Sequence, residues 1–401
     1  MKKLLALALV LATLLTSTGF LGFLDFGSKT ITDPVLSPFT GDNLPTASYL
    51  SPLSGEHALI SASMRSGSGY VYAQYVYDAA ADRSFPVTMR RQDSDAWDAF
   101  IREAIGKRTS GDYSLYLRLL ETDGPASLLE YEQLHVYSVS DRYAYCASSL
   151  LYGLLDFRTG ELLPLDPATA ASHITPWNEL LRHEYLGDGF RLHLTDLQGN
   201  ILHSADVDIG ASPLPIIIPL TDGLAVLRSG AINRNEDSVI SCLLLDRELN
   251  AVREITLAEA LPISRINDIV LSARTGHLLI STACGLLVVP EEGGDCLLIS
   301  ENRGEMTSSS TTLPSDRLNS ADKSYNMIHV IGFAADGSCA LLSTKNSGLY
   351  KLDMNTLTLT CQMTQQELDQ YNLILSDVMG MRWDGGQYAV YPRGVMRVQD
   401  R

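Results

Sequence analysis

Short runs of apolar and β-branched residues, separated by turn residues, recur along most of the chain. The first group has four such runs, which begin near Tyr49, Glu56, Tyr70 and Ser84. Glycine or aspartate occurs between the runs, as in β-hairpins. The runs are too short for typical helices and are rich in Val, Ile, Leu and Tyr. The pattern therefore predicts a small antiparallel sheet of four strands.

The same four-run pattern returns through residues 143–163, 179–207, 215–257, 269–299 and 328–362. The turn between the first and second strands carries glycine at residues 55, 223, 276, 337 and 385. Third strands begin with glycine at residues 153, 285, 348 and 394. Hairpin turns favour glycine because a central position needs a positive φ. Apolar residues on both faces of the strands indicate small sheets that stack on one another around an axis, as in a β-propeller.

The last unit, residues 379–401, has only three strands before the chain ends. The β-prone segment 28–36 could supply the missing outer strand and so cover edges that would otherwise be exposed. We therefore predict an all-β fold, a single β-propeller domain over residues 28–401, with seven four-stranded blades. Six or eight blades are the alternatives.

Three turns resemble a known family. Ser51-Pro52-x-x-Gly55, Ala335-Asp336-Gly337 and Trp383-Asp384-Gly385 each precede an apolar strand. They look like the Ser-Pro-Asp-Gly turn of TolB-like propellers and of the propeller domains of prolyl-oligopeptidase-type enzymes. The resemblance implies a propeller fold and no particular activity, because propellers carry many functions. The proline occurs only at Pro52, and the aspartate is missing at Gly55 and Gly276.

The N-terminus indicates export. Lys2 and Lys3 precede an apolar run from Leu4 to Leu15, and small residues follow at Ser17-Thr18-Gly19. This arrangement predicts a signal peptide over residues 1–19. The alternative is an uncleaved membrane anchor, because apolar residues resume at Phe20. We expect an extracellular or cell-envelope protein that contacts membrane only through such an anchor.

The net charge is −17, which argues against nucleic acid as a partner. Cys284 and Cys296 flank a short hairpin and are the best candidates for a disulfide. The other cysteines mostly lie within apolar strand patterns and are expected to be buried thiols. No Cys-x-x-Cys spacing occurs, and we expect no metal, no cofactor and a monomer.

Long insertions interrupt the repeat at residues 91–124, 166–177, 230–238, 301–324 and 364–372. By propeller topology they should all decorate one face, where long loops commonly carry function. In the first insertion, Trp97 and Phe100 fall at helical spacing, which predicts a helical insertion. That helix either packs across the propeller or docks a partner.

Polar residues also enter the innermost strands, which would line a central channel. Candidate binding residues at its mouth are Asn267, Asp268, Asn326, His329 and Asp377. A wet, polar channel without a ligand is the alternative. The chain has no Gly-x-Ser-x-Gly, no His-Glu-x-x-His and no phosphate-binding glycine loop, so no catalytic residue is assigned.

We therefore expect an exported binding protein, not an enzyme, whose long-loop face binds a protein, peptide or glycan. One alternative is a glycan- or peptide-acting enzyme that uses carboxylates at the channel mouth. Another is a structural module of an envelope assembly.

Overall fold

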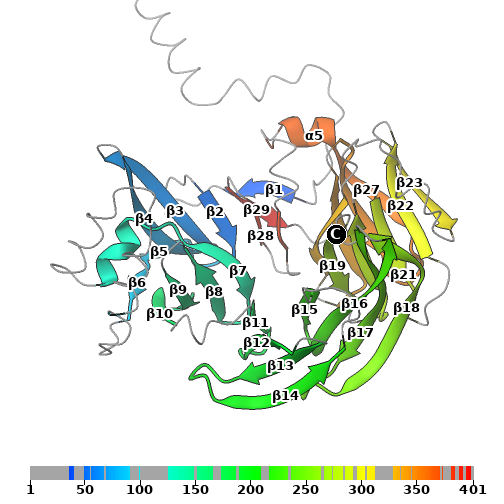
Figure 1. Cartoon of the computed structure of the whole chain (residues 1–401). Coiled ribbons are helices and arrows are strands. Elements are labelled where there is room, and N and C mark those ends of the chain that lie inside the picture. Colours follow the sequence, from blue (N-terminus) through cyan, green and yellow to red (C-terminus); the bar gives the residue numbers. More distant parts are fainter. Residues whose placement is uncertain are drawn as a thin grey trace, which may run out of the picture. The chain divides into compact units, whose positions relative to one another are not determined.

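The computed structural model describes residues 36–39, 49–90, 99, 125–311 and 328–398, with short gaps inside the longer ranges. Within these residues the strands form seven sheets (Figure 1). The first contains β2 (Tyr49–Pro52), β3 (His57–Ser66), β4 (Gly69–Asp78) and β5 (Arg83–Pro86). The second contains β7 (His135–Val139), β8 (Tyr143–Ala147), β9 (Tyr152–Asp156) and β10 (Glu161–Pro164), with β6 (Thr88–Met89) added parallel to β10.

The third sheet contains β11 (His173–Ile174), β12 (Leu180–Tyr185), β13 (Phe190–Thr195) and β14 (Ile201–Val207). The fourth contains β15 (Ile216–Leu220), β16 (Gly223–Asn233), β17 (Glu236–Leu245) and β18 (Ala251–Pro262). The fifth contains β19 (Ile266–Leu271), β20 (Leu278–Thr282), β21 (Gly285–Val289), β22 (Cys296–Asn302) and β23 (Glu305–Thr311). The sixth contains β24 (Ile328–Phe333), β25 (Cys339–Thr344), β26 (Gly348–Asp353) and β27 (Leu359–Thr364).

The last sheet contains β1 (Leu36–Phe39), β29 (Gly394–Val398) and β28 (Tyr388–Tyr391), in that order. Beside β28, Arg382 and Val390 exchange two backbone hydrogen bonds, 2.8 and 3.0 Å long. The sheet thus has three strands and one isolated bridge among the described residues.

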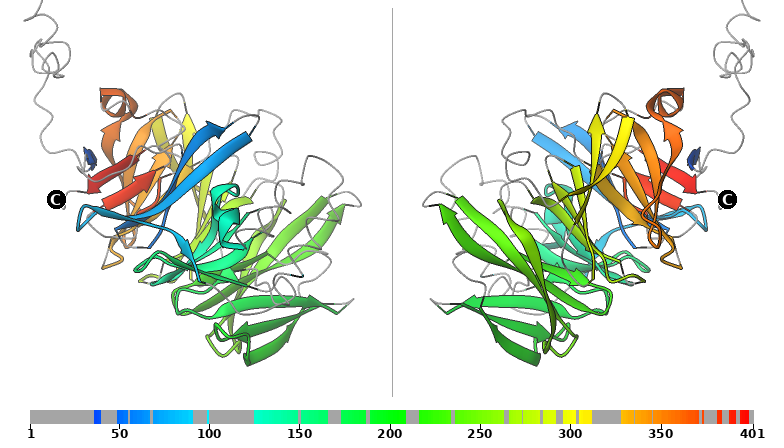
Figure 2. Two further views of the ribbon diagram at one scale, coloured as in Figure 1. Left: turned by 90° about the vertical axis from the view of Figure 1, so that its left-hand side faces the viewer. Right: turned by 90° about the vertical axis from the view of Figure 1, so that its right-hand side faces the viewer.

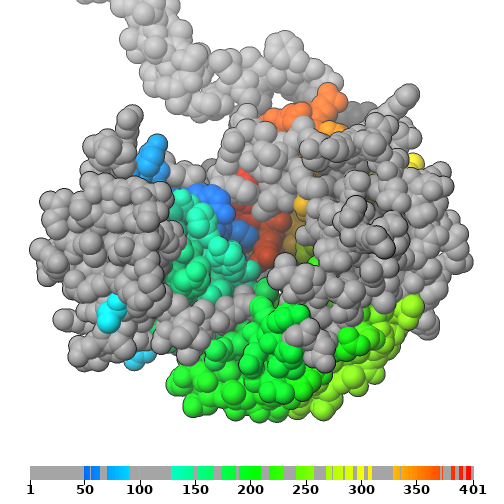
Figure 3. All heavy atoms as spheres, viewed as in Figure 1, coloured from blue at the N-terminus to red at the C-terminus, as the bar shows by residue number. Residues whose placement is uncertain are grey.

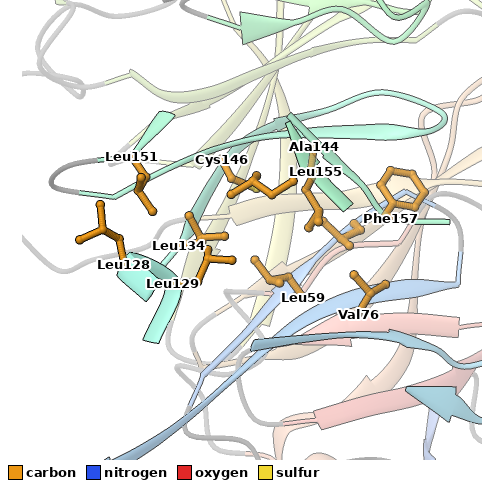
Figure 4. Close-up of a cluster of buried hydrophobic side chains, with 12 residues drawn as sticks. Leu59, Val76, Leu128, Leu129, Leu134, Ala144, Cys146, Leu151, Leu155 and Phe157 are labelled. Atoms are coloured by element: carbon orange, nitrogen blue, oxygen red, sulfur yellow. The ribbon is translucent and has the colours of Figure 1, made fainter. Parts of the chain in front are cut away.

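Each sheet packs on the next through a cluster of buried apolar side chains. Figure 4 shows the cluster between the first and second sheets, where Leu59 and Val76 meet Cys146 and Leu155. The third and fourth sheets share a similar cluster, and their green surfaces adjoin in Figure 3. The last sheet packs on the first in the same way, since Tyr388 and Val390 meet Leu50. Stacked antiparallel sheets with these shared cores are the architecture of a β-propeller, so the all-β prediction is confirmed.

The prediction of seven four-stranded blades is wrong. Six sheets have four or five strands, and only these are complete blades among the described residues. The remaining sheet has three strands, because its first segment contributes only the bridge at Arg382.

The N-terminal strand that pairs with β29 also differs from the predicted segment. It is β1, residues Leu36–Phe39, in antiparallel register with Leu36 opposite Val398 and Phe39 opposite Val395. The predicted closing strand, 28–36, overlaps it only at Leu36, and the rest of that segment lies outside the described residues. Proline at residue 38 is compatible with this position because an outer strand needs hydrogen bonds on one edge only.

Aspartate caps the turn between third and fourth strands in several sheets. Asp246 accepts hydrogen bonds from the backbone N–H groups of Glu248 and Asn250 at 3.0 and 2.8 Å. Asp196 makes the equivalent bonds to Gln198 and Asn200. Related turns occur at Asp78, Asp156 and Asp353. The side chain thus satisfies turn donors that no strand neighbour can reach.

Glycine has two different roles at the predicted turn positions. Gly276 and Gly337 adopt φ of 66° and 67°, as a left-handed turn position requires. Gly348 opens β26 with φ of 105°, and a Cβ there would also overlap the backbone carbonyl of Met363. Gly348 is therefore required for two reasons: its positive φ, and the close approach of β27 to its backbone.

Two of the predicted insertions are ordered extensions of the sheets. Residues 230–238 fall mostly within β16 and β17, and residues 301–311 fall mostly within β22 and β23. The Ser- and Thr-rich stretch that enters β23 is a strand at residues 305–311, not a linker, because it pairs with β22 along its length. The β3–β4 hairpin likewise extends beyond its four-residue neighbours (Figure 2).

The described helices are short. Helix α5 (Gln365–Gln370) follows β27 inside the predicted insertion 364–372, and the 3-10 helix η2 (Pro125–Glu130) precedes β7. Of the predicted helix with Trp97 and Phe100, only Ala99 is described, and it is helical. Trp97, Phe100, the predicted signal peptide and Cys284 lie outside the described residues. No helix among the described residues is long and apolar enough to cross a membrane.

Candidate functional site

The first strands of the sheets lie next to one another. β2 contacts β7, β7 contacts β11, and β15 contacts β19. The backbone N–H of Trp383 also donates to the carbonyl of Ile331 in β24 at 2.8 Å. Each sheet therefore places its first strand toward its neighbours' first strands, and residues where these strands begin share one end of the sheets.

Three charged or titratable side chains come together from three successive sheets. Asp268 is the third residue of β19, His329 is the second residue of β24, and Arg382 forms the bridge beside β28. Asp268 interacts electrostatically with both of the others. We call Asp268, His329 and Arg382 the charged triplet.

The side chain of Asp268 is exposed to solvent, but enough protein atoms lie around its carboxyl group to reduce the hydration of the charge. Desolvation raises the pKa of its carboxyl group, while a backbone hydrogen bond and the charge of Arg382 act in the opposite direction. The hydrogen bond comes from the N–H of Ile269 to Oδ1 at 2.8 Å. Opposite Asp268, Ser281 donates from Oγ to the carbonyl of Ile328 at 2.5 Å, which ties β20 to β24. The carboxylate is thus held on a fixed backbone with one oxygen open.

His329 is half-buried, and its Nε2 atom is buried without a hydrogen-bond partner. Desolvation lowers the pKa of the imidazole and outweighs the charge of Asp268. Ser343 lies directly opposite His329 in the β24–β25 ladder, and its buried Oγ also has no partner. Buried polar atoms normally find partners, so a water molecule between these two atoms would satisfy both.

Arg382 has an exposed side chain, although its backbone is fixed by the two hydrogen bonds to Val390. The structure assigns it no ion pair with the described carboxylates within 4.0 Å. Eight described arginines form such pairs elsewhere in the molecule. Arg382 therefore presents its guanidinium donors to solvent beside Asp268.

Aromatic rings occupy the beginnings of first strands in the first two sheets. Tyr49 opens β2 and His135 opens β7, with ring centroids 6.0 Å apart in an edge-on arrangement. Tyr137 lies two residues further along β7 and is 61% exposed, whereas Tyr49 is 37% exposed. We call Tyr49, His135 and Tyr137 the aromatic triplet, and both triplets together the first-strand site.

The structure places only part of the predicted set. Asp268 and His329 are brought together, and Asn267 immediately precedes Asp268 in β19. Asn326 and Asp377, like Trp97 and Phe100, lie outside the described residues. Arg382 and the aromatic triplet were not predicted from the sequence. Tyr49, His135 and Tyr137 stand within the first three positions of a first strand, which is a signal that could have found them.

The first-strand site has groups that could bind a ligand by hydrogen bonds and ring contacts. The described residues contain no group of three His, Cys, Asp or Glu side chains arranged to hold a metal ion. Asp268 is the one carboxylate in the charged triplet, so a glycosidase-type carboxylate pair is not formed within it. Hydrogen-bond donors, acceptors and exposed rings are what the site provides.

Comparisons with known proteins give no family. No protein-family model and no curated protein matches the chain. Among solved structures, the Cps50 (Swd1) β-propeller domain of Myceliophteria thermophila shares 10% identity at a TM-score of 0.42, over 91% of this chain and 100% of that one. The extracellular domain of a putative hybrid two-component system from B. thetaiotaomicron shares 12% identity at a TM-score of 0.39, over 92% of this chain and 40% of that one.

Proposed function

We propose that the protein is an exported, non-enzymatic β-propeller that binds a protein, peptide or glycan ligand at the first-strand site. The observation that carries this proposal is the grouping of Asp268, His329 and Arg382, from three sheets, with open hydrogen-bonding capacity. Rigid strands hold the backbone of each residue, so the site is pre-organised, which lowers the entropic cost of binding.

The three-stranded sheet of β1, β28 and β29 joins the sixth sheet to the first in this proposal. Its cores with both neighbouring sheets support that role. Export rests on the sequence of residues 1–19 alone.

A binding screen tests the function. The wild-type chain and a variant with Asp268→Asn, His329→Gln and Arg382→Gln are applied to arrays of glycans and peptides. A matched control carries Arg158→Gln and Glu248→Gln, two exposed residues in turns at the opposite end of the sheets.

We expect at least one ligand whose signal falls tenfold or more in the site variant and is unchanged in the control. Equal signals for all three proteins on every ligand would contradict the proposal. Far-ultraviolet circular dichroism verifies that the variants are folded.

A further inference from the structure

Arg382 determines what kind of ligand the first-strand site favours. Its guanidinium is exposed, fixed at the backbone, and without a described ion-pair partner within 4.0 Å. A guanidinium presents paired N–H donors that match the two oxygens of a carboxylate. An open arginine on a chain of net charge −17 is therefore a place for a negatively charged ligand group.

Asp268 requires that the ligand also carry hydrogen-bond donors. One carboxylate oxygen accepts the N–H of Ile269, and the other has no described donor. A simple anion would be repelled by this carboxylate, so the ligand must also carry hydrogen-bond donors.

The aromatic triplet supplies ring faces. Tyr49 and Tyr137 are the exposed large hydrophobic side chains on described first strands, and no exposed aliphatic side chain accompanies them there. An aliphatic peptide side chain would favour an apolar pocket. Exposed tyrosine rings at the same end of the sheets as the charged triplet suit a ligand with one less polar face and many hydroxyl groups.

From these features we propose that the ligand is a glycan containing an acidic sugar, a hexuronate. The sugar carboxylate binds Arg382, its hydroxyl groups donate to Asp268, and neighbouring sugar rings lie against Tyr137 or Tyr49. This inference rests on the proposed function and specifies its ligand class.

The test uses three trisaccharide probes with the full chain: a galacturonic acid trimer, its methyl ester, and a neutral galactose trimer. Titration calorimetry measures the dissociation constant for the wild type, Arg382→Gln and the control Arg158→Gln. We expect the wild type to bind the acid at least tenfold more tightly than the ester. Arg382→Gln should weaken binding of the acid at least tenfold, and Arg158→Gln should leave it unchanged.

Two outcomes overturn the inference. The first is equal affinity for the acid and its ester, or acid binding that does not depend on Arg382. The second is a peptide from the array that requires the charged triplet while the acid trimer does not bind. In that second case the proposed function stands and only the ligand class is wrong. If no glycan or peptide depends on the triplet, the proposed function itself fails.

Discussion

At the residue scale, a few buried polar groups hold neighbouring blades in place. Gln74 in β4 is 6% exposed and bonds to three backbone groups around η2. Its Nε2 donates to the carbonyls of Leu129 and Glu132 at 3.0 and 3.1 Å, and its Oε1 accepts the N–H of Leu134 at 3.0 Å. These bonds hold the connection that leads into β7, which carries His135 and Tyr137 of the aromatic triplet.

Replacing Gln74 with alanine should therefore destabilise the protein. Three buried backbone groups lose their partner, and we expect a loss of about 2–4 kcal/mol in the free energy of unfolding. Denaturant unfolding measures it, with the exposed Gln198→Ala as the control. A loss no larger than that of the control would show that water replaces the side chain.

Substitution of Gly332 tests how closely β24 approaches the segment that precedes β28. A Cβ at Gly332 would overlap the carbonyl oxygen of Trp383. Gly332→Ala should cost about 2–4 kcal/mol, because backbone must move. Gly199→Ala is the control, because Gly199 has a φ of 87° and open space around it. It should lower the free energy of unfolding by roughly 1 kcal/mol through the unfavourable backbone conformation alone. Equal costs for the two variants would contradict this contact.

Asp268→Asn should raise the melting temperature at neutral pH. The raised pKa of Asp268 means that its ionised form is less favourable in the folded protein than in the unfolded chain. Its destabilising effect is therefore present at neutral pH and disappears as the pH falls and the group becomes protonated. A lower melting temperature for the variant, measured by differential scanning calorimetry, would show that the carboxylate has a structural role.

At the element scale, the turn aspartates make stability sensitive to acid. Hydrogen bonds to turn N–H groups or neighbouring side chains lower the pKa of Asp196, Asp246 and Asp353. A lowered carboxyl pKa gives stability that is present above the unfolded pKa and is lost as pH falls through the folded one. His329 acts in the same direction below its unfolded pKa of about 6.5, since its pKa is also lowered.

We therefore expect the melting temperature to fall as the pH falls below about 5, where the unfolded carboxylates begin to take up protons. The double variant Asp196→Asn, Asp246→Asn should have a flatter profile between pH 5 and pH 3. Calorimetry across that range measures the slope. Parallel profiles for variant and wild type would mean that other carboxylates determine acid unfolding.

The strands were predictable because the apolar runs and turn residues agree with one another. The short unit at residues 179–207 supplies three strands of its sheet, and the fourth, β11, lies at His173–Ile174 inside the predicted insertion 166–177. The aspartate turn also has a sequence signal, an aspartate at the end of a third strand with Asn or Gly four residues later, as at Asp196 and Asp246. The extensions of β16–β17 and β22–β23 were not predicted, because polar Ser, Thr and Asn residues look like loops unless their pairing partner is known.

At the whole-molecule scale, two segments far apart in sequence complete the last sheet. Hydrophobic pattern alone placed the N-terminal strand too early, at 28–36, because Ile31 and Val35 look more strand-like than Pro38. Pairing with β29 selects Leu36–Phe39 instead. Asp268 and His329 could be predicted from their places in first strands. Arg382 precedes the turn residues Asp384 and Gly385 and looked like part of that turn, because its pairing with Val390 is visible only in the structure.

Deleting residues 1–39 should lower the melting temperature by several degrees, because β29 loses its outer partner. Deleting residues 1–34 keeps β1 and serves as the control. Thermal unfolding followed by circular dichroism compares the two chains. Identical melting curves would show that β1 does not stabilise the last sheet.

The central claim, that ligand binds where the first strands begin, is tested most directly by photo-crosslinking. A benzoylphenylalanine replaces Tyr137 in one protein and Glu248, in a turn at the opposite end of the sheets, in another. Each is irradiated with the best ligand from the binding screen and examined by mass spectrometry. We predict a ligand adduct at position 137 and none at position 248. Adducts at position 248 alone, or equal labelling at both positions, would contradict the account.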